Sequence, residues 1–558
     1  MRKVEVALGQ AYRYATHVRR FDQALRTPLP AQHDKLMQVI KANENTAFGQ
    51  KHNFAKINSI SDYQSLVPPN TYEDLQPYIE RVMNGRRGQL TNEDVVMFAT
   101  TSGTTGKPKY IPITPSHLKD YTHAFQVQNY KMIVDYPGAP LGTYMIFSSN
   151  DEEGRTAAGI PFGSVSGLLR QRQSSLVQKY FALPHQVSRI KDVEVKYYVM
   201  LRLALCQDVS AILGCNPSSM LLLADQMQER AEELISDIAE GTLRKAFMPP
   251  PAIAEPLSRH FVHDRVRAQE LQRILDKHGR LTPELVWPNM AMLSCWKGGP
   301  MSFYLDRLPA AYGDLPIRDF GYMASEGRGT ISISHQGAGG VVALTCHFFE
   351  FVPENEKDSP NPTFLTVDQL ELGGRYYIYF TTSSGLYRYD INDLIEVEGF
   401  EYNTPVIRFV QKGMGVSSVT GEKITEEQVQ VALQYALRML NLSGIEHFTF
   451  AVEMDYPPHY VCFAEVKQDL PDSVVQEFLR VFEQSLQLQN IEYKDKRATK
   501  RLGSPKFQKV PNGTFTRLRQ HRVSAGAPEA QVKIPLLNAG VDFYHTLATI
   551  GCVLSLTN

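Results

Sequence analysis

The chain has 558 residues, too many for one compact core, and domains of about 100–200 residues predict roughly two to four of them. Its composition, 43% hydrophobic and 21% charged with a formal net charge of −1, is ordinary for a soluble globular protein. It also gives no overall field that would attract nucleic acid or an anionic membrane.

No stretch reaches the ~18 apolar residues expected of a membrane span, and the N-terminus lacks the apolar run of a signal peptide. None of the six cysteines forms a CxxC pair, which argues against a disulfide scaffold and against structural zinc. We therefore expect reduced thiols, no membrane span and a cytoplasmic location.

The N-terminal 60 residues are typical of helices, and the apolar spacing from Leu36 to Ile40 predicts a helix that ends near Asn43–Asn45. Val95–Thr100 is a short apolar run, which leads into a turn rich in Gly, Ser and Thr. Tyr110–Ile113 then alternates like a strand. The predicted order here is strand, loop, strand.

The middle of the chain mixes long helical patterns with short strands. One helix is predicted over Leu221–Ala239. Arg375–Val397 alternates well on both sides of Ser383–Gly385, which predicts two strands joined by a tight turn.

A domain boundary is predicted near residues 408–424, where the sequence becomes rich in Gly and Ser. Thr425 followed by Gln428 is a capping-box pattern that begins a new helix. Two strands and a helix are predicted after it: His447–Met454, Tyr460–Val466 and Val474–Phe482. A small α+β module therefore follows a large α/β body.

The segment Thr100–Lys109, with the sequence TTSGTTGKPK, is the most informative stretch for function. Its two glycines allow sharp turns that bring backbone N–H groups close to an anion, and its hydroxyls and lysines add donors and charge. A Walker P-loop is excluded by the spacing. Composition alone leaves two readings open, a polyphosphate-binding loop and a flexible surface turn.

The order of these residues resembles the phosphate-binding signature of the adenylate-forming, firefly-luciferase-like superfamily. Other blocks resemble the acyl acid–amido synthetases, a family first known from plants as auxin-responsive gene products. These blocks are 43–54, 67–75, Lys109–Thr114, Asn216–Ser218, Tyr322–Gly327, Phe348–Pro353, Thr381–Asp393 and Gly421–Glu426. Short motifs recur by chance, but eight of them in the order of the family make chance an unsatisfactory explanation.

The resemblance implies an α/β fold, with a large N-terminal adenylate-forming domain of mixed sheets and helices and a small mobile α+β C-terminal domain. We place the N-terminal adenylation domain at 1–410, a hinge at 411–424 and the C-terminal domain at 425–558. The family's reaction has two steps: a carboxylate attacks the α-phosphate of ATP, and an amino acid's amine then attacks the acyl-adenylate.

The resemblance also assigns roles to residues. By this resemblance, the residues of the signature loop bind the phosphates of ATP: Ser102, Gly103, Thr104, Thr105, Gly106 and Lys109. The ring of Tyr322 would lie against adenine, Ser325 would contact the α-phosphate region, and Glu326 would help to hold Mg²⁺, which prefers carboxylate and phosphate oxygens. Taken alone, the same stretch is also compatible with a strand terminus that carries an exposed glutamate.

Asp393 matches the aspartate that accepts hydrogen bonds from the ribose hydroxyls, and Asp390 is its rival. The family usually has Gly before this aspartate, whereas this chain has Asn392, a residue that tolerates left-handed backbone. Lys412 stands where an arginine is common. Lys423 matches a catalytic lysine of the family, and a solvated lysine beside a helix cap is the alternative.

The leading hypothesis is an ATP- and Mg²⁺-dependent acyl acid–amido synthetase whose catalytic residues are Lys109, Glu326 and Lys423. Its partners would be a small carboxylic acid and an amino acid, with no nucleic acid, and we expect a monomer. Two alternatives are an acyl-CoA or acyl-carrier ligase and a catalytically degenerate nucleotide-binding homologue. The sequence does not identify the acid or the amine.

Overall fold

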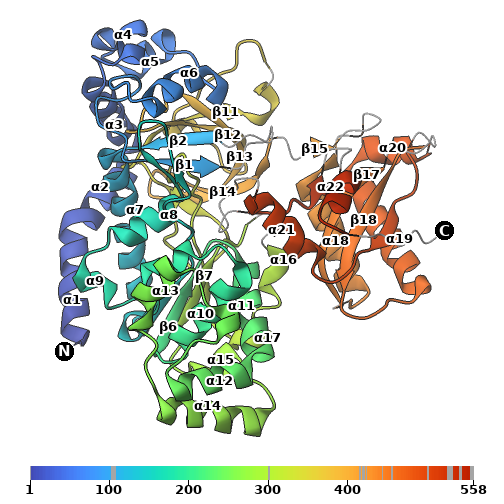
Figure 1. Cartoon of the computed structure of the whole chain (residues 1–558). Coiled ribbons are helices and arrows are strands. Elements are labelled where there is room, and N and C mark those ends of the chain that lie inside the picture. The colour runs from blue at the N-terminus through green and yellow to red at the C-terminus, as the bar shows by residue number, and fades with distance from the viewer. Residues whose placement is uncertain are drawn as a thin grey trace. The chain divides into compact units, whose positions relative to one another are not determined.

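The computed structural model describes residues 2–101, 109–298, 302–357, 359–413, 416–417, 422, 424–442, 444–453, 457–498, 502–524, 532–538 and 543–552. The chain divides into two compact units (Figure 1). The N-terminal unit comprises Met1–Ile391 and Ile395–Phe409, and the C-terminal unit comprises Asn392–Leu394 and Val410–Asn558. Within the described ranges, no helix combines the length and the apolarity needed to cross a membrane.

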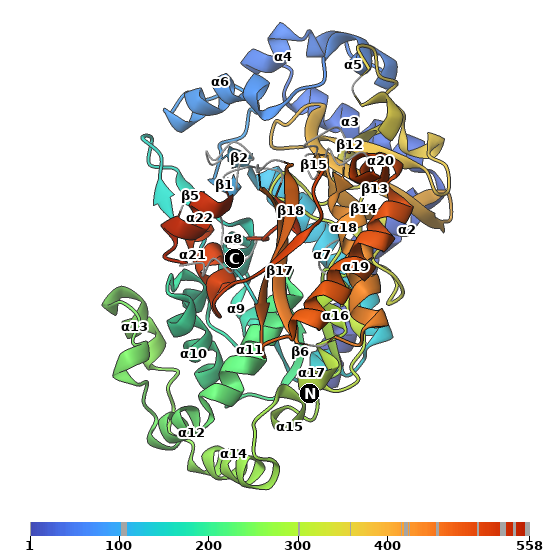
Figure 2. The same cartoon turned by 90° about the vertical axis from the view of Figure 1, so that its right-hand side faces the viewer.

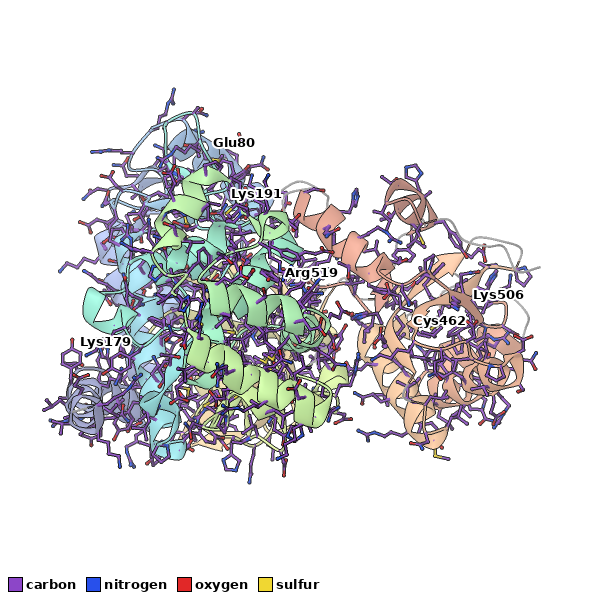
Figure 3. All side chains as sticks on the ribbon, turned by 60° about the horizontal axis from the view of Figure 1, so that its bottom comes forward. Glu80, Lys179, Lys191, Cys462, Lys506 and Arg519 are labelled. Carbon is purple, nitrogen blue, oxygen red and sulfur yellow. The ribbon has the colours of Figure 1, made fainter. Side chains whose placement is uncertain are left out.

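The N-terminal unit begins with helices, as predicted. They are α1 (Arg2–Arg13), α2 (Arg19–Arg26), α3 (Pro28–Ala42), α4 (Ala47–Lys51), α5 (Ile60–Leu66) and α6 (Tyr72–Met83). The C-cap of α3 is Asn43, which confirms the predicted end of that helix. An ion pair of 2.8 Å between Glu5 Oε2 and Lys179 Nζ ties α1 to the rest of the unit. Lys179 is labelled in Figure 3.

A parallel sheet of four strands has the order β3 (Thr143–Ile146), β6 (Val209–Leu213), β7 (Met292–Cys295) and β8 (Ile317–Asp319). β6 and β7 are buried at every position, as expected of strands that are covered on both faces. Parallel strands need long crossovers, and helices fill them. These are α8 (Val165–Gln171), α9 (Ser175–Gln178), α10 (Val193–Ala204), α11 (Pro217–Glu229), α12 (Ala231–Glu240), α13 (Pro251–Ser258), α14 (Arg265–His278), α15 (Pro283–Val286), α16 (Ser302–Leu305) and α17 (Pro309–Tyr312).

The single helix predicted over Leu221–Ala239 is two helices. α11 ends at Glu229 and α12 begins at Ala231, with Arg230 between them at φ −108° and ψ 18°. The apolar residues on both sides of the break are buried in one core. The helical spacing of apolar residues therefore continues across the break, and periodicity alone does not reveal it.

Two further sheets hold the segments that carry the predicted motifs. One has the order β2 (Lys109–Ile113), β1 (Met97–Thr101), β5 (Pro161–Gly163) and β4 (Gly154–Arg155), and α7 (Pro115–Asp135) follows β2. The other has the order β11 (Phe348–Pro353), β12 (Arg375–Thr381), β13 (Tyr389–Glu401), β14 (Thr404–Lys412), β10 (Gly340–Val342) and β9 (Thr330–Ile331).

The predicted turn between the strands β12 and β13 is confirmed. Gly385 has φ +93°, and a Cβ there would lie 2.5 Å from the Cβ of Leu90. The turn thus needs glycine both for its backbone conformation and for the close approach of Leu90.

The C-terminal unit is an α+β module. Its sheet has the order β19 (Lys506–Lys509), β18 (His459–Val466), β17 (Ile445–Glu453) and β20 (Leu537–Asn538), and β15 (Val416–Ser417) pairs with β16 (Ile424–Thr425). Its helices are α18 (Glu426–Met439), α19 (Asp472–Gln489), α20 (Ile491–Ala498), α21 (Thr514–Ser524) and α22 (Phe543–Thr549). The predicted capping box of Thr425 and Gln428 is confirmed at the start of α18.

Helices cover both faces of this sheet (Figure 2). On one face Phe450 of β17 stacks on Phe482 of α19, with 4.5 Å between ring centroids. On the other face Phe463 of β18 contacts Phe543 of α22 at 5.0 Å. Alternate residues of the strands therefore serve two cores, as the period of two predicts.

Candidate functional site

The structure describes part of the predicted site. Six of the predicted residues lie outside the described residues: Ser102, Gly103, Thr104, Thr105, Gly106 and Lys423. The remaining five are Lys109, Tyr322, Ser325, Glu326 and Asp393. The geometry of the site is therefore built from the elements that flank the loop and from the motifs around residues 322–329 and 388–393.

The two strands on either side of the signature loop, β1 and β2, are paired with each other. β1 and β2 pair antiparallel as far as Thr101 opposite Lys109, the two described residues on either side of segment 102–108. The amide of Tyr110 donates a 2.9 Å hydrogen bond to the hydroxyl of Tyr72 in α6. Lys109 Nζ lies 5.3 Å from the centre of the Tyr72 ring, within the range of a cation–π contact. A positive charge is thus held where the loop ends.

Residues 322–329 form a tight hairpin that carries Ser325 and Glu326 at its tip. Met323 and Arg328 form an antiparallel bridge. Inside it, the amide of Ala324 donates to the carbonyl of Gly327 at 2.9 Å, and the amide of Gly327 donates back at 3.3 Å. Both tip residues are buried, Ser325 with 4% and Glu326 with 7% of its surface exposed. The exposed glutamate that was the alternative reading is therefore excluded.

The aromatic ring of Tyr322 lies at the base of this hairpin. It stacks on Phe409 with ring centroids 5.9 Å apart and contacts the edge of Phe380 at 6.3 Å. A Cβ at position 329 would lie only 2.2 Å from the Tyr322 ring, so Gly329 gives the ring its space. The glycine after the motif is thus a requirement of the ring's position.

The backbone before the hairpin is fixed by polar contacts to Gly321, which has φ +84°. The indole Nε1 of Trp296 donates to the carbonyl of Gly321 at 2.9 Å. The carboxylate of Asp319 accepts from the amides of Gly321 at 2.6 Å and Lys297 at 2.8 Å. Burial raises the pKa of Asp319 to about 6 against these two donors. Trp296 thus has a positioning contact as well as a packing role.

The motif at 388–393 is held by a buried ion pair. Arg388 Nε lies 2.9 Å from Glu350 Oε2, and its Nη1 donates to the carbonyls of Gln64 at 3.0 Å and Val67 at 2.7 Å. Asp390 pairs with Lys357 through Oδ2, to which the Tyr379 hydroxyl also donates at 3.2 Å.

Asp393 and Asn392 lie in β13. Asn392 has φ +56°, which confirms that asparagine adopts the left-handed backbone here in place of the family's glycine. The amide of Gly413 donates to the carbonyl of Asn392 at 2.9 Å. Asp393 is buried, with 2% of its surface exposed. Asn392 therefore keeps a left-handed backbone conformation within β13, so the departure from the family's glycine is tolerated here.

Arg328 and His347 are positioned at the hairpin, although the sequence analysis gave them no role. Both are fully buried, and the amide of Arg328 donates to His347 Nε2 at 3.0 Å. The signal for Arg328 was its place between two glycines directly after Glu326. His347 gave no signal, because it precedes an ordinary strand.

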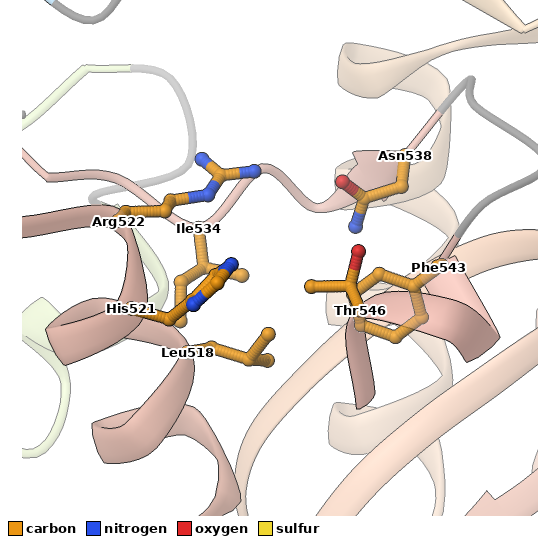
Figure 4. Close-up of a pocket in the computed structure, with 7 residues that line it drawn as sticks. All are labelled: Leu518, His521, Arg522, Ile534, Asn538, Phe543 and Thr546. Carbon is orange, nitrogen blue, oxygen red and sulfur yellow. The ribbon is translucent and has the colours of Figure 1, made fainter. Parts of the chain in front are cut away.

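A cavity of about 150 Å³ lies within the C-terminal unit, and none of the described residues of the predicted site lines it (Figure 4). Its walls combine an apolar part with a polar edge: Leu518, Ile534 and Phe543 against His521, Arg522, Asn538 and Thr546. In the described part of the chain, no three His, Cys, Asp or Glu side chains are grouped to hold a metal ion.

Three domain families match the chain in order. The GH3 family N-terminal domain matches residues 17–317, the GH3 family central domain matches 340–412, and the GH3 family C-terminal domain matches 427–539. The first of these alone covers more than half of the chain.

Curated relatives are similar over most of their length. The indole-3-acetic acid-amido synthetase GH3.3 of Arabidopsis thaliana is 26% identical over 528 residues, which cover 90% of this chain and 88% of the relative. The jasmonoyl--L-amino acid synthetase JAR4 of Nicotiana attenuata is 25% identical over 526 residues, 90% of each chain.

Solved structures share the fold. A GH3.15 acyl acid amido synthetase superposes with a TM-score of 0.83 at 22% identity and covers 94% of this chain and 95% of its own. A 2-hydroxyisobutyryl-CoA ligase in the postadenylation state superposes with a TM-score of 0.53 at 14% identity, over 93% and 91%. The predicted α/β adenylate-forming fold is confirmed, and so is the class of amide-forming ligase. The chain belongs to the GH3 family.

Proposed function

We propose that the protein activates a small carboxylic acid with ATP, releasing pyrophosphate, and transfers the acyl group to an amino acid's amine, releasing AMP. The observation that carries this proposal is the buried tip of the 322–329 hairpin, which presents Ser325 and Glu326 in a chain similar to amido synthetases over 90% of its length. The relatives named above act on indole-3-acetic acid or form jasmonoyl conjugates. An apolar carboxylic acid is therefore the proposed substrate class.

Nucleotide binding is assigned to four described residues and the signature loop. The ring of Tyr322 would stack on adenine, since its stacking on Phe409 fixes its plane. Lys109 and the loop residues Ser102–Gly106 would surround the phosphates, and Ser325 would donate to the α-phosphate. Asp393 would accept from the ribose hydroxyls. Asp390 is the weaker candidate because Lys357 and Tyr379 already engage its carboxylate.

The first step joins two anions, the substrate carboxylate and the α-phosphate, so catalysis must reduce their repulsion. Lys109 supplies a positive charge on a rigid strand for this purpose. A Mg²⁺ ion bound to the phosphates would neutralise further charge. Mg²⁺ bound to nucleotides keeps phosphate and water ligands and needs only one or two protein carboxylates, and the buried Glu326 fits that requirement.

We also propose domain boundaries and a role for Lys423. The adenylation domain would extend over 1–410, the hinge over 411–424 and the small domain over 425–558. Lys423 would act on the phosphates as a catalytic lysine. We propose that the protein acts as a monomer in the cytoplasm, without nucleic acid.

The test is acid-dependent exchange of labelled pyrophosphate into ATP with Mg²⁺ and no amine, over a panel of indole, jasmonate-like, aryl and fatty acids. Exchange with at least one acid is expected, followed by amide and AMP formation when amino acids are added. If the protein consumes CoA but no amino acid, it is an acyl-CoA ligase. If it binds ATP but exchanges nothing across the panel, it is a degenerate homologue.

A further inference from the structure

Arg328 bridges the two ends of the hairpin from inside the N-terminal unit. Its side chain is 0% exposed. Nε donates to the carbonyl of Thr330 at 2.8 Å, and Nη2 donates to the carbonyl of Phe320 at 2.7 Å and to the amide oxygen of Gln128. Phe320 and Thr330 lie on either side of the hairpin, so one guanidinium fixes the distance between its ends.

The hydrogen-bond partners of this guanidinium in the described part of the chain are neutral, and the carboxylate of Asp319 attracts it only electrostatically. They are the carbonyl and amide oxygens, the Met323 sulfur at 2.9 Å and the faces of two rings, of which Phe125 is 4.9 Å away. A buried charge is costly unless an opposite charge both lies close and accepts its hydrogen bonds, and an apolar residue often replaces such a group without loss of stability. A buried cation here is therefore better explained by where it holds the backbone than by stability.

His347 fixes the hairpin from the opposite side. Its Nε2 accepts a hydrogen bond from the amide of Arg328 at 3.0 Å, so this nitrogen carries no proton and the imidazole is neutral. Burial lowers the pKa of His347, which keeps the ring neutral. A Cβ at position 327 would lie 2.9 Å from the same nitrogen, so Gly327 permits this approach. The bond leads directly from the imidazole to the residue two positions after Glu326.

We infer that Arg328 and His347 are positioning residues, which together fix the Ser325–Glu326 tip for the reaction. The inference rests on the proposed function for its effect on rate and on the geometry alone for its effect on the hairpin. Neither side chain is assigned to touch the nucleotide. A displaced tip would misplace the groups that meet the α-phosphate and the metal, and a misplacement of about 1 Å costs on the order of 10²-fold in rate.

The experiment uses H347L, which removes the acceptor, and H347Q, which restores an acceptor near Nε2. R328M removes the bridge. R202M is its matched control, because Arg202 is also 0% exposed and donates to two carbonyls, Thr242 at 3.0 Å and Val262 at 3.1 Å, in another part of the unit. Pyrophosphate exchange is measured per folded molecule, together with KM for ATP and the Mg²⁺ concentration at half-saturation. Amide hydrogen exchange at Gly327 and Arg328 is measured on the same proteins.

We expect H347L and R328M to lower kcat by about 10–100-fold and to raise the Mg²⁺ requirement, and H347Q to recover to within about threefold. R202M should lose stability but keep its rate per folded molecule. The Arg328 amide should lose protection in H347L and keep it in H347Q. Unchanged kinetics in H347L and R328M, or equal loss of protection in H347L and H347Q, would overturn the inference. A wild-type protein without exchange activity would refute the proposed function instead, and hydrogen exchange would still decide the positional role.

Discussion

Arg388 and Glu350 form an ion pair in the interior of the N-terminal unit, with 2.9 Å between Nε and Oε2 and with 4% and 1% of their side chains exposed. Arg388 has φ +44°, a backbone conformation that non-glycine residues rarely adopt. The ion pair and the two carbonyl contacts hold this strained residue in place. The segment that leads to Asp390 and Asp393 therefore depends on a carboxylate 38 residues away.

Removal of that carboxylate should be strongly destabilising. Glu350→Ala would leave the Arg388 guanidinium buried without its counter-charge, and loss of one partner of a buried pair costs about 3–5 kcal/mol. Urea unfolding of the wild type and the variant measures the difference. Glu477→Ala is the control, because the Glu477–Arg480 pair is largely exposed, and it should leave the midpoint unchanged. Equal midpoints for Glu350→Ala and wild type would contradict the structural role of the pair.

The buried carboxyl of Asp319 makes stability depend on pH. Its folded pKa is about 6, raised chiefly by burial, against about 3.9 in an unfolded chain. Between these values the folded state binds the proton more tightly, so the contribution of this carboxyl to stability is fully present below about pH 4 and is lost as pH rises through 6. The contribution is about 3 kcal/mol.

Asp319→Asn should remove this component. Urea midpoints measured from pH 4 to pH 7.5 should decline less steeply in the variant than in the wild type, whatever the absolute stability of the variant. Equal slopes in the two proteins would mean that the carboxyl of Asp319 titrates as it does in the unfolded chain.

Gly329 can be tested through the ring it accommodates. Gly329→Ala would place a Cβ 2.2 Å from the Tyr322 ring and displace it. If that ring stacks on adenine, KM for ATP should rise by about fivefold to tenfold, the value of an aromatic contact of about 1 kcal/mol. Gly399→Ala is the matched control, since no atom lies within 4 Å of a Cβ there. An unchanged KM for ATP in Gly329→Ala would mean that the Tyr322 ring does not contact the nucleotide.

The sequence predicted the parts of this site that depend on neighbouring residues. The capping box at Thr425, the turn at Gly385 and the glycines around Tyr322 each follow from local backbone requirements. Contacts between distant segments were missed. Arg328 donates a hydrogen bond to Gln128 of α7, and its amide donates to His347, the residue before β11. The fold brings these segments to the hairpin, and no periodicity in the sequence encodes that. The break at Arg230 was missed for the opposite reason, because the apolar pattern continues across it.

Lys109 is predicted to stabilise the transition state of the first step. Lys109→Ala should lower pyrophosphate exchange by about 10²–10³-fold, the usual effect of losing one stabilising group aimed at developing charge. Lys109→Arg should recover part of the rate, because the charge remains at the end of the loop. Lys179→Ala removes an exposed lysine of the same unit and should have no effect. A wild-type rate in Lys109→Ala would exclude the residue from the site.

Asp393 and Asp390 make opposite predictions for ribose recognition. Asp390 already pairs with Lys357 and Tyr379, so Asp390→Asn should lower stability and leave KM for ATP within about twofold. Asp393→Asn should raise KM for ATP by roughly 10–100-fold, since a hydrogen bond to a charged acceptor contributes about 1.5–3 kcal/mol.

A comparison of ATP with 2′-deoxy-ATP identifies the acceptor directly. If Asp393 binds the ribose hydroxyls, the wild type should prefer ATP and Asp393→Asn should lose most of that preference, because the group that reads the hydroxyl is gone. Asp390→Asn should keep it. The reverse pattern would make Asp390 the ribose ligand, and its bond to Lys357 would then have to break when nucleotide binds. If both variants still prefer ATP over 2′-deoxy-ATP, neither Asp393 nor Asp390 binds the ribose hydroxyls.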